Sequence, residues 1–462
     1  MSKKSLLVVL LLAVLLIGVV APVAAQEPVT ITWFVGLGTG TNSEQIEIQN
    51  QVVADFNATH DNIELVINIA ASNETSRDTL STLLAAGTPP DIVGPVGVAG
   101  SNSFADQWAT NIDDLAADAG FDTSVFDPAL IDLYRTEDGG LAGLPFAVYP
   151  AVTYYNEDLF DEAGLNYPPA EFGAPYVMPD GTEVAWSYDT AAEIAKILTV
   201  DANGNDATME GFDPSAIEQF GLNFQWARIR LIWTDLQPAT WYDAETNTVT
   251  VPEEWRQASQ WYWDRIWTDR TAPNATLMNS EILQPSGFAS GNLAMSIVPL
   301  WYTCCLDNSV GNFNWDIAPV PASFDGEQHV AMDADTFRLV AASAHPAEAF
   351  EVLTYLVTEA APVLASAYGA YPALPAAQPA WVEAISARYP LGVNWDVAAA
   401  SLAYANPGPV HHESNLPNYT QVYDREFQLL SLIEGDTGAD IDLNAEIDAF
   451  EADVNTIVQS GS

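Results

Sequence analysis

The sequence predicts an α/β protein of two or three domains or of two large lobes. Segments of strand character alternate with segments of helical character, which predicts a sheet covered by helices on both faces. The chain has 462 residues, a length at which globular proteins form two or three domains or two large lobes. Its residues are 49% hydrophobic and 11% aromatic, so apolar side chains suffice for these cores and disorder is excluded.

Residues 1–25 have the features of a secretory signal peptide. Two lysines precede an apolar run over residues 6–20, and small residues ending at Ala25 suit cleavage after that position. A retained membrane anchor is the alternative, because the uncharged stretch is nearly long enough to span a bilayer. The first cysteine of the chain is Cys304, so there is no lipoprotein cysteine at the cleavage point. We therefore expect a secreted, extracytoplasmic protein in the periplasm or at the cell surface.

The mature chain begins with a strand, a glycine-rich loop and a helix. The apolar segment 29–35 predicts a buried strand, and a helix is predicted from about 43 to 59. The glycines of the loop 36–40 complete neither a GxxxxGK[ST] nor a GxGxxG phosphate motif. A tight turn that faces a ligand is the expected structure, because ligands of such sheets bind beyond the carboxyl ends of the strands.

A strand, a helix and another strand follow. Apolar and polar residues alternate over 63–69, which predicts a half-buried strand. A helix is predicted over 76–86, and the Gly-Thr-Pro-Pro segment at 87–90 ends it. The next strand is predicted to start at 91–93.

The most specific motif lies in the middle of the chain. Residues 144–165 read LPFAVYPAVTYYNEDLFDEAGL, with two prolines at 168–169. This segment resembles the family 1 extracellular solute-binding proteins of ABC importers, the relatives of maltose-binding protein. Residues 87–93, 288–295 and 343–349 are similar to the same family in the expected order, so the resemblance covers essentially the whole mature chain.

The resemblance implies a fold and a function. The fold is the type II periplasmic-binding-protein fold, with two α/β lobes joined by hinge strands and a ligand cleft between them. The first lobe is predicted at 27–147 plus 335–375, and the second at 148–334 plus 376–462. The implied function is binding of a carbohydrate, first of all an oligosaccharide, and its delivery to ABC permease subunits in the membrane. We expect a monomer without enzymatic activity or a required cofactor.

The ligand-contacting residues are predicted from the resemblance and from topology. Sugars present hydroxyls and faintly apolar ring faces, so their sites need flat aromatic rings and a few polar groups. By resemblance, the aromatic positions fall on Tyr149, Trp226, Trp301 and Tyr423. The topology adds polar residues of the first lobe, namely Thr39, Thr41, Ser101 and Asn102.

Some of these aromatic positions have alternatives. Tyr149 replaces the acidic residue found there in the maltose binder, which puts a maltose-type hydrogen-bonding pattern in doubt. Trp226 has the helical spacing to Ile229 and Trp233 of a core residue. The tryptophans between 255 and 267 are expected to form a buried helix face instead of a binding site.

Cys304 and Cys305 are adjacent. An even pair of cysteines in an oxidising compartment favours a disulfide, although neighbouring residues close only a strained eight-membered ring. Such a vicinal disulfide beside the cleft would give a rigid, apolar platform for a ligand ring. The alternatives are two reduced thiols or pairing between molecules.

A polar loop over 201–210 partly matches a calcium-binding loop. Position 6 is Asp206 where an EF-hand has glycine, and position 12 is Phe212 where it has glutamate. The loop is similar to the metal loop of alginate-binding members of the family, in which an acid at the position of Glu210 closes the site. A solvated polar turn is the alternative. A structural calcium ion would be held by Asp201, Asn203, Asn205 and Glu210, with the carbonyl of Ala207.

The charge excludes some partners. With 13 Lys and Arg against 62 Asp and Glu, the formal net charge is −49, which repels nucleic acid and anionic membranes. A neutral or cationic solute is therefore expected. The shortage of Lys and Arg limits positive self-repulsion in acidic surroundings, which is one explanation of this composition. A high-salt habitat is the competing explanation of the same shortage.

Two other functions remain open for the sequence. A secreted glycoside hydrolase would use two carboxylates, and among 62 acids no pair stands out. No GxSxG or HExxH motif is present. A lectin that binds glycans without transport is the other alternative.

Overall fold

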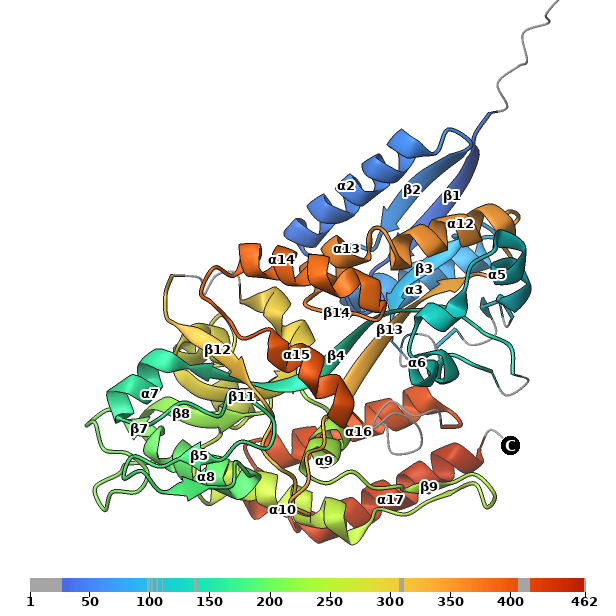
Figure 1. Ribbon diagram of the computed structural model, residues 1–462. Coiled ribbons are helices and arrows are strands. Elements are labelled where there is room, and N and C mark those ends of the chain that lie inside the picture. Colours follow the sequence, from blue (N-terminus) through green and yellow to red (C-terminus); the bar gives the residue numbers. More distant parts are fainter. Residues whose placement is uncertain are drawn as a thin grey trace, which may run out of the picture.

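The computed structural model shows two lobes joined by long strands (Figure 1). It describes residues 27–97, 100, 103–104, 107–109, 111–136, 139–306, 311–405 and 416–460. The predicted signal peptide, 1–25, and the predicted site residues Ser101 and Asn102 lie outside the described residues. The α/β class and the two-lobed architecture predicted from the sequence are confirmed.

The first lobe is built on a parallel sheet at the start of the chain. Strand β1 pairs in parallel with β2 on one side and with β3 on the other. The predicted order of strands and helices is confirmed, with β1 at Val29–Val35, α2 at Ser43–Thr59, β2 at Ile63–Ile69, α3 at Asn73–Ala85 and β3 at Ile92–Val96.

Helix α3 begins three residues earlier than the sequence predicted. The side chain of Ser72 accepts a hydrogen bond from the backbone N–H of Thr75, so Ser72 is the N-cap. The helix therefore starts at Asn73, close to the carboxyl end of β2.

Two long strands connect the lobes. Strand β4 (Leu144–Asn156) is buried along its whole length. Its first half pairs with β13 (Met332–Leu339), and its second half pairs with β11 (Leu293–Pro299) and β12 (Trp315–Ala318). Since β13 also pairs with β3, one sheet passes from the first lobe into the second, in the order β2-β1-β3-β13-β4-β11-β8-β7.

The second lobe surrounds β11 and its parallel neighbour β8 (Ile217–Asn223). Helix α10 (Glu253–Trp267) buries Trp255 and Trp261 in the core of this lobe, which confirms the predicted buried helix face. The other helices of this lobe are α7 (Glu157–Ala163), α8 (Tyr188–Ile197), α9 (Ile229–Leu236), α11 (Ala275–Met278), α16 (Tyr419–Glu434) and α17 (Leu443–Gln459).

The remaining elements are short strands and helices. The strands are β5 (Tyr176–Val177), β6 (Glu183–Val184), β7 (Val200–Asp201), β9 (Tyr242–Asp243), β10 (Thr248–Val249) and β14 (Tyr371–Pro372). The helices are α5 (Asp113–Ala119), α6 (Pro128–Leu133), α12 (Pro346–Val357), α13 (Ala361–Tyr368), α14 (Gln378–Arg388) and α15 (Asp396–Ser401).

The C-terminal segment begins at the junction of the lobes. Helix α14 packs against α13, and its Trp381 and Ile385 join the core cluster that contains Phe146 of β4. Helices α16 and α17 pack together in the second lobe. The lobe limits at 147/148 and 375/376 stay a prediction.

In the described part of the chain, no single helix combines the length and apolarity needed to cross a membrane. The bent pair of α12 and α13 meets the criteria of length and composition when taken together.

Candidate ligand-binding cleft

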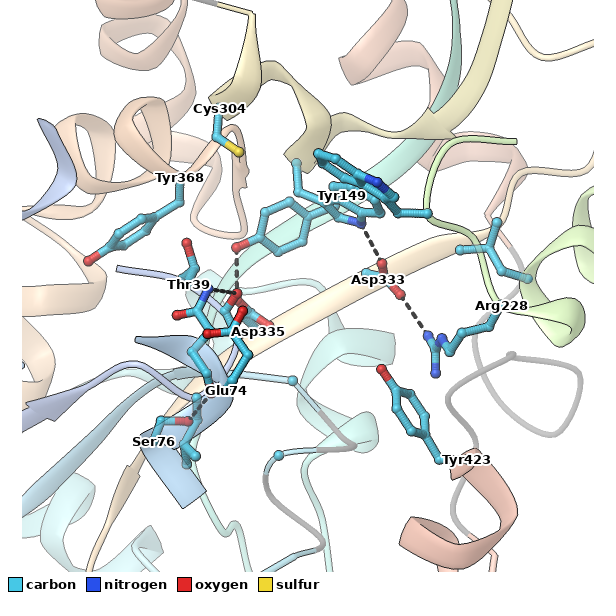
Figure 2. Close-up of a pocket in the computed structure, with 18 of the residues that line it drawn as sticks. Thr39, Glu74, Ser76, Tyr149, Arg228, Cys304, Asp333, Asp335, Tyr368 and Tyr423 are labelled. Carbon is cyan, nitrogen blue, oxygen red and sulfur yellow. Dashed lines mark hydrogen bonds and ion pairs between the residues drawn. The ribbon is translucent and has the colours of Figure 1, made fainter. Parts of the chain in front are cut away.

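A cleft of about 860 Å³ lies between the lobes. The loop after β1 and the start of α3 line it from the first lobe, the strands β4 and β13 line its base, and residues of the second lobe face them (Figure 2). Its volume falls within the range of about 300–1,000 Å³ that is usual for ligand sites. The cleft brings together five predicted residues, which are Thr39, Tyr149, Trp226, Trp301 and Tyr423.

The other predicted contacts lie elsewhere or outside the described residues. Thr41 does not line the cleft, because its hydroxyl turns to Asn73 and donates to Oδ1 at 3.1 Å. Asn73 itself does line the cleft. Ser101 and Asn102 are outside the described residues, but the neighbouring Gly100 is a lining residue.

Trp226 and Trp301 form an aromatic wall. Their rings are nearly parallel, with an interplanar angle of 10° and centroids 6.4 Å apart, and Tyr302 meets Trp226 edge-on. Trp226 is 53% exposed and its φ is 52°, so the core position considered from its spacing is wrong. A bulky residue in this left-handed conformation costs roughly 1–3 kcal/mol and is found mainly where function requires it. The wall thus offers an accessible flat face for ligand stacking.

Asp333 on β13 holds this wall in place. Nε1 of Trp301 donates to Oδ2 of Asp333 at 2.7 Å, and the guanidinium of Arg228 approaches Oδ1 at 3.3 Å (Figure 2). The same guanidinium lies 4.8 Å from the ring centre of Tyr423 and donates to the hydroxyl of Tyr419 at 3.1 Å. Through Arg228, the carboxylate of Asp333 therefore connects Trp301 with Tyr423 and Tyr419.

A second carboxylate on β13 lies beside Tyr149. The Tyr149 hydroxyl donates to Oδ2 of Asp335 at 2.8 Å. Burial raises the pKa of Asp335 to about 7; the hydrogen bond from Tyr149 opposes this rise and the charge of Asp333 adds to it. Asp335 therefore changes its charge near neutral pH, at the base of the cleft.

Several lining residues of the cleft were not predicted from the sequence. Asp333 and Asp335 are two residues apart on one strand, so both side chains point to the same face, and this alternation was a usable signal. Asn73 and Glu74 follow β2 at the edge where ligands of parallel sheets bind. The missed residues include Asn73, Glu74, Arg77, Arg228, Asp333, Asp335 and Tyr368.

The adjacent cysteines are at one end of the cleft. Cys304 lines it, and its sulfur is 2.8 Å from the sulfur of Cys305. A disulfide bond measures about 2.05 Å, so the structure holds two thiols here. The vicinal disulfide stays a prediction for the protein in its oxidising compartment.

The proposed calcium loop is arranged around Asp201. The carboxylate of Asp201 accepts hydrogen bonds from the backbone N–H groups of Asn203, Asn205 and Asp213 at 2.8–2.9 Å. Nδ2 of Asn205, and not its oxygen, faces Asp201, and Glu210 is exposed. Among the described residues, no group of three acidic, His or Cys side chains is placed to hold a metal ion. As arranged, these residues do not fit an ion, and calcium binding stays a prediction.

Comparison with known proteins identifies the family. A sequence profile described as bacterial extracellular solute-binding protein matches residues 42–361, which is more than half of the chain. The chain belongs to this family. Its members bind solutes outside the cytoplasm, so this solute-binding protein is placed among extracytoplasmic binding proteins.

Solved structures of similar fold agree with this family. An ABC substrate-binding protein of Listeria monocytogenes, in complex with cycloalternan, is 16% identical with a TM-score of 0.72, over 93% of this chain and 99% of that one. The GacH receptor of Streptomyces glaucescens, solved unliganded and with acarbose, is 15% identical with a TM-score of 0.68, over 95% and 100%. The maltose/maltodextrin-binding domain MalE of Bdellovibrio bacteriovorus, bound to maltotriose, is 17% identical with a TM-score of 0.66, over 93% and 100%. At such identities these likenesses show the fold of this solute-binding protein, the type II two-lobed fold.

Proposed function

We propose that the protein binds a neutral carbohydrate, most simply an oligosaccharide, in the cleft between its lobes and delivers it to an ABC permease. The observation that carries this proposal is the wall formed by Trp226 and Trp301 opposite polar groups of the first lobe. Flat aromatic rings pack against the apolar faces of sugars, and hydroxyl, amide and carboxylate groups bind their hydroxyls. Structures of similar fold that were solved with cycloalternan or maltotriose bound support the same ligand class.

Closure of the lobes is the proposed mechanism. Strands β4 and β13 are the covalent and hydrogen-bonded connections that run from one lobe into the other. A small change in their backbone angles would bring Thr39 and Asn73 toward the aromatic wall, as in hinge-type domain closure. The ligand would shift the open–closed equilibrium by binding the closed state more tightly.

The cleft chemistry favours binding over hydrolysis. A glycosidase needs two carboxyl groups that are free to act on the scissile bond. Asp333 accepts from Trp301 and pairs with Arg228, and Asp335 accepts from Tyr149. These two carboxylates are engaged by the protein's own donors, and Glu74 is the one other carboxylate among the described lining residues. The described lining therefore lacks a pair of free carboxyl groups, which suits a receptor without enzymatic activity.

The proposed partners are a carbohydrate and the permease subunits of an ABC transporter. Delivery requires permease subunits in the membrane, and this distinguishes the protein from a glycan-binding lectin. The net charge of −49 supports a protein that binds no nucleic acid. We expect the mature protein to act as an extracytoplasmic monomer.

A thermal-shift screen with carbohydrates, amino acids and metal ions tests the proposal. A carbohydrate that binds only the folded state raises the melting temperature by mass action. Mass spectrometry of the same carbohydrate after prolonged incubation should show it unchanged, whereas a hydrolase would cleave it. Stabilisation by no carbohydrate, or by amino acids alone, would contradict the proposed ligand class. Loss of uptake on deletion of the gene, restored by the wild-type protein, would separate a transport receptor from a lectin.

A further inference from the structure

A second cavity of about 390 Å³ adjoins the cleft. The start of α2, residues 42–45, lines it from the first lobe, and Pro285 and Ser286 line it from the second. Trp226 and Cys304 line both this cavity and the cleft. Its volume is itself within the range of about 300–1,000 Å³ that is usual for ligand sites.

The second cavity lengthens the cleft at one end. Cys304 lies on the opposite side of the cleft from Arg228 and Tyr423 (Figure 2), so a cavity that shares Cys304 extends away from those residues. The two cavities are also linked through the first lobe. Gln45, which lines the second cavity, donates from Nε2 to the hydroxyl of Thr39 in the cleft at 3.3 Å.

The lining of the second cavity suits hydroxyl-rich rings without charge. Asn42 and Ser43 are exposed polar residues, and Ser286 adds a half-buried hydroxyl from the other lobe. The charges present compensate each other, since the guanidinium of Arg388 pairs with the carboxylate of Glu44 at 3.1 Å. Arg388 is further fixed by the backbone carbonyl of Ser366, to which its Nη1 donates at 2.9 Å.

We infer that this cavity is a distal subsite for a linear, neutral oligosaccharide that extends past Trp226. One part of the chain of sugars lies in the cleft against the Trp226 and Trp301 wall, and further units lie between the start of α2 and Ser286. The inference rests on the proposed function and sharpens it, because it makes chain length a determinant of affinity. A ligand that contacts α2 and Ser286 together also bridges the two lobes at a second place.

The test blocks the distal subsite and leaves the cleft untouched. In Ser43→Trp, an exposed residue of the second cavity is replaced by one that fills it; Asn50→Trp places the same side chain on an exposed position of the same helix outside both cavities. Calorimetric titrations use maltotriose and maltoheptaose, and mannotriose and mannohexaose. Circular dichroism and urea unfolding establish that both variants fold.

For the series that binds, the wild type should bind the longer sugar at least about tenfold more tightly than the trisaccharide. Each factor of ten in affinity corresponds to about 1.4 kcal/mol of binding free energy. Ser43→Trp should lose this preference and retain the trisaccharide affinity, and Asn50→Trp should match the wild type. Equal affinities of the wild type for short and long sugars would overturn the distal subsite and leave the proposed function intact. An equal loss of the preference for the longer sugar in both variants would do the same. Binding of none of these sugars would count against the proposed function and remove the inference with it.

Discussion

Asp235 on α9 gives the clearest prediction about pH. Its side chain is fully buried, and Oδ1 accepts the backbone N–H of Ala331 at 2.9 Å. Among the described residues, Oδ2 has no hydrogen-bond partner. Burial raises the pKa of Asp235 to about 8. The hydrogen bond from the Ala331 N–H opposes this rise, and the charge of Asp333 adds to it. The folded protein therefore holds a proton on Asp235 at neutral pH.

The sign and size of the effect follow from proton binding. In the unfolded chain an aspartate has a pKa of about 3.9, so between pH 5 and 7 only the folded state carries this proton. Stability then falls as pH rises, by about 1.4 kcal/mol for each pH unit and about 2.7 kcal/mol over this interval. Asp335 and Glu434, whose pKa values burial raises to about 7, contribute with the same sign. Greater stability in acid agrees with the base-poor composition.

The assay compares wild type with Asp235→Asn. The amide keeps an oxygen for Ala331 and has no proton to lose, so the decline in stability from pH 5 to pH 7 should shrink by about 2.7 kcal/mol. The free energy of unfolding is measured by urea titration with tryptophan fluorescence at both pH values. Asp118→Asn makes the same exchange at an exposed position and should keep the wild-type decline. A decline in Asp235→Asn equal to that of the wild type would refute the reasoning.

Three further predictions concern individual residues. Trp226→Ala should weaken carbohydrate binding by about tenfold or more in calorimetric titrations with little change in unfolding, because the ring is half exposed; an unchanged dissociation constant would remove it from the site. Asp333→Asn removes the charge between Arg228 and Trp301, so binding should weaken and the free energy of unfolding should fall by about 1.5–3 kcal/mol; wild-type values for both would contradict its positioning role. Asp201→Ala leaves backbone donors of the 201–213 turn without their acceptor, so differential scanning fluorimetry should show a lower melting temperature than that of the wild type, with and without a chelator. A variant that melts at the same temperature as the wild type would contradict the role of Asp201 as acceptor. If calcium added after chelation raises the melting temperature of the wild-type protein, that would support a metal loop.

Much of the fold could be predicted because local patterns determine it. The apolar run of β1, the alternation of β2 and the breaker at 87–90 place the first-lobe elements within a few residues. Thr39 could be placed near the cleft because the ends of strands in such sheets have known positions. The aromatic residues Tyr149, Trp226, Trp301 and Tyr423 came from the family resemblance.

The rest depends on contacts that local patterns do not contain. Asp333 reaches Trp301 and Arg228 only because β13 pairs with both β3 and β4, and this register is set by residues far apart in sequence. Trp226 has helical spacing but takes a left-handed backbone conformation just before α9. Thr41 was predicted from its loop alone, and its bond to Asn73 depends on how α3 packs beside that loop.

The central claim is that the cleft between the lobes binds a carbohydrate. The most direct measurement is calorimetric titration of the wild type and of a Trp226→Ala, Trp301→Ala double variant with the carbohydrate that gives the largest thermal shift. We predict one carbohydrate bound per wild-type chain, and an affinity reduced by about a hundredfold or more in the folded double variant. Equal affinity of the two proteins for that carbohydrate would contradict the claim.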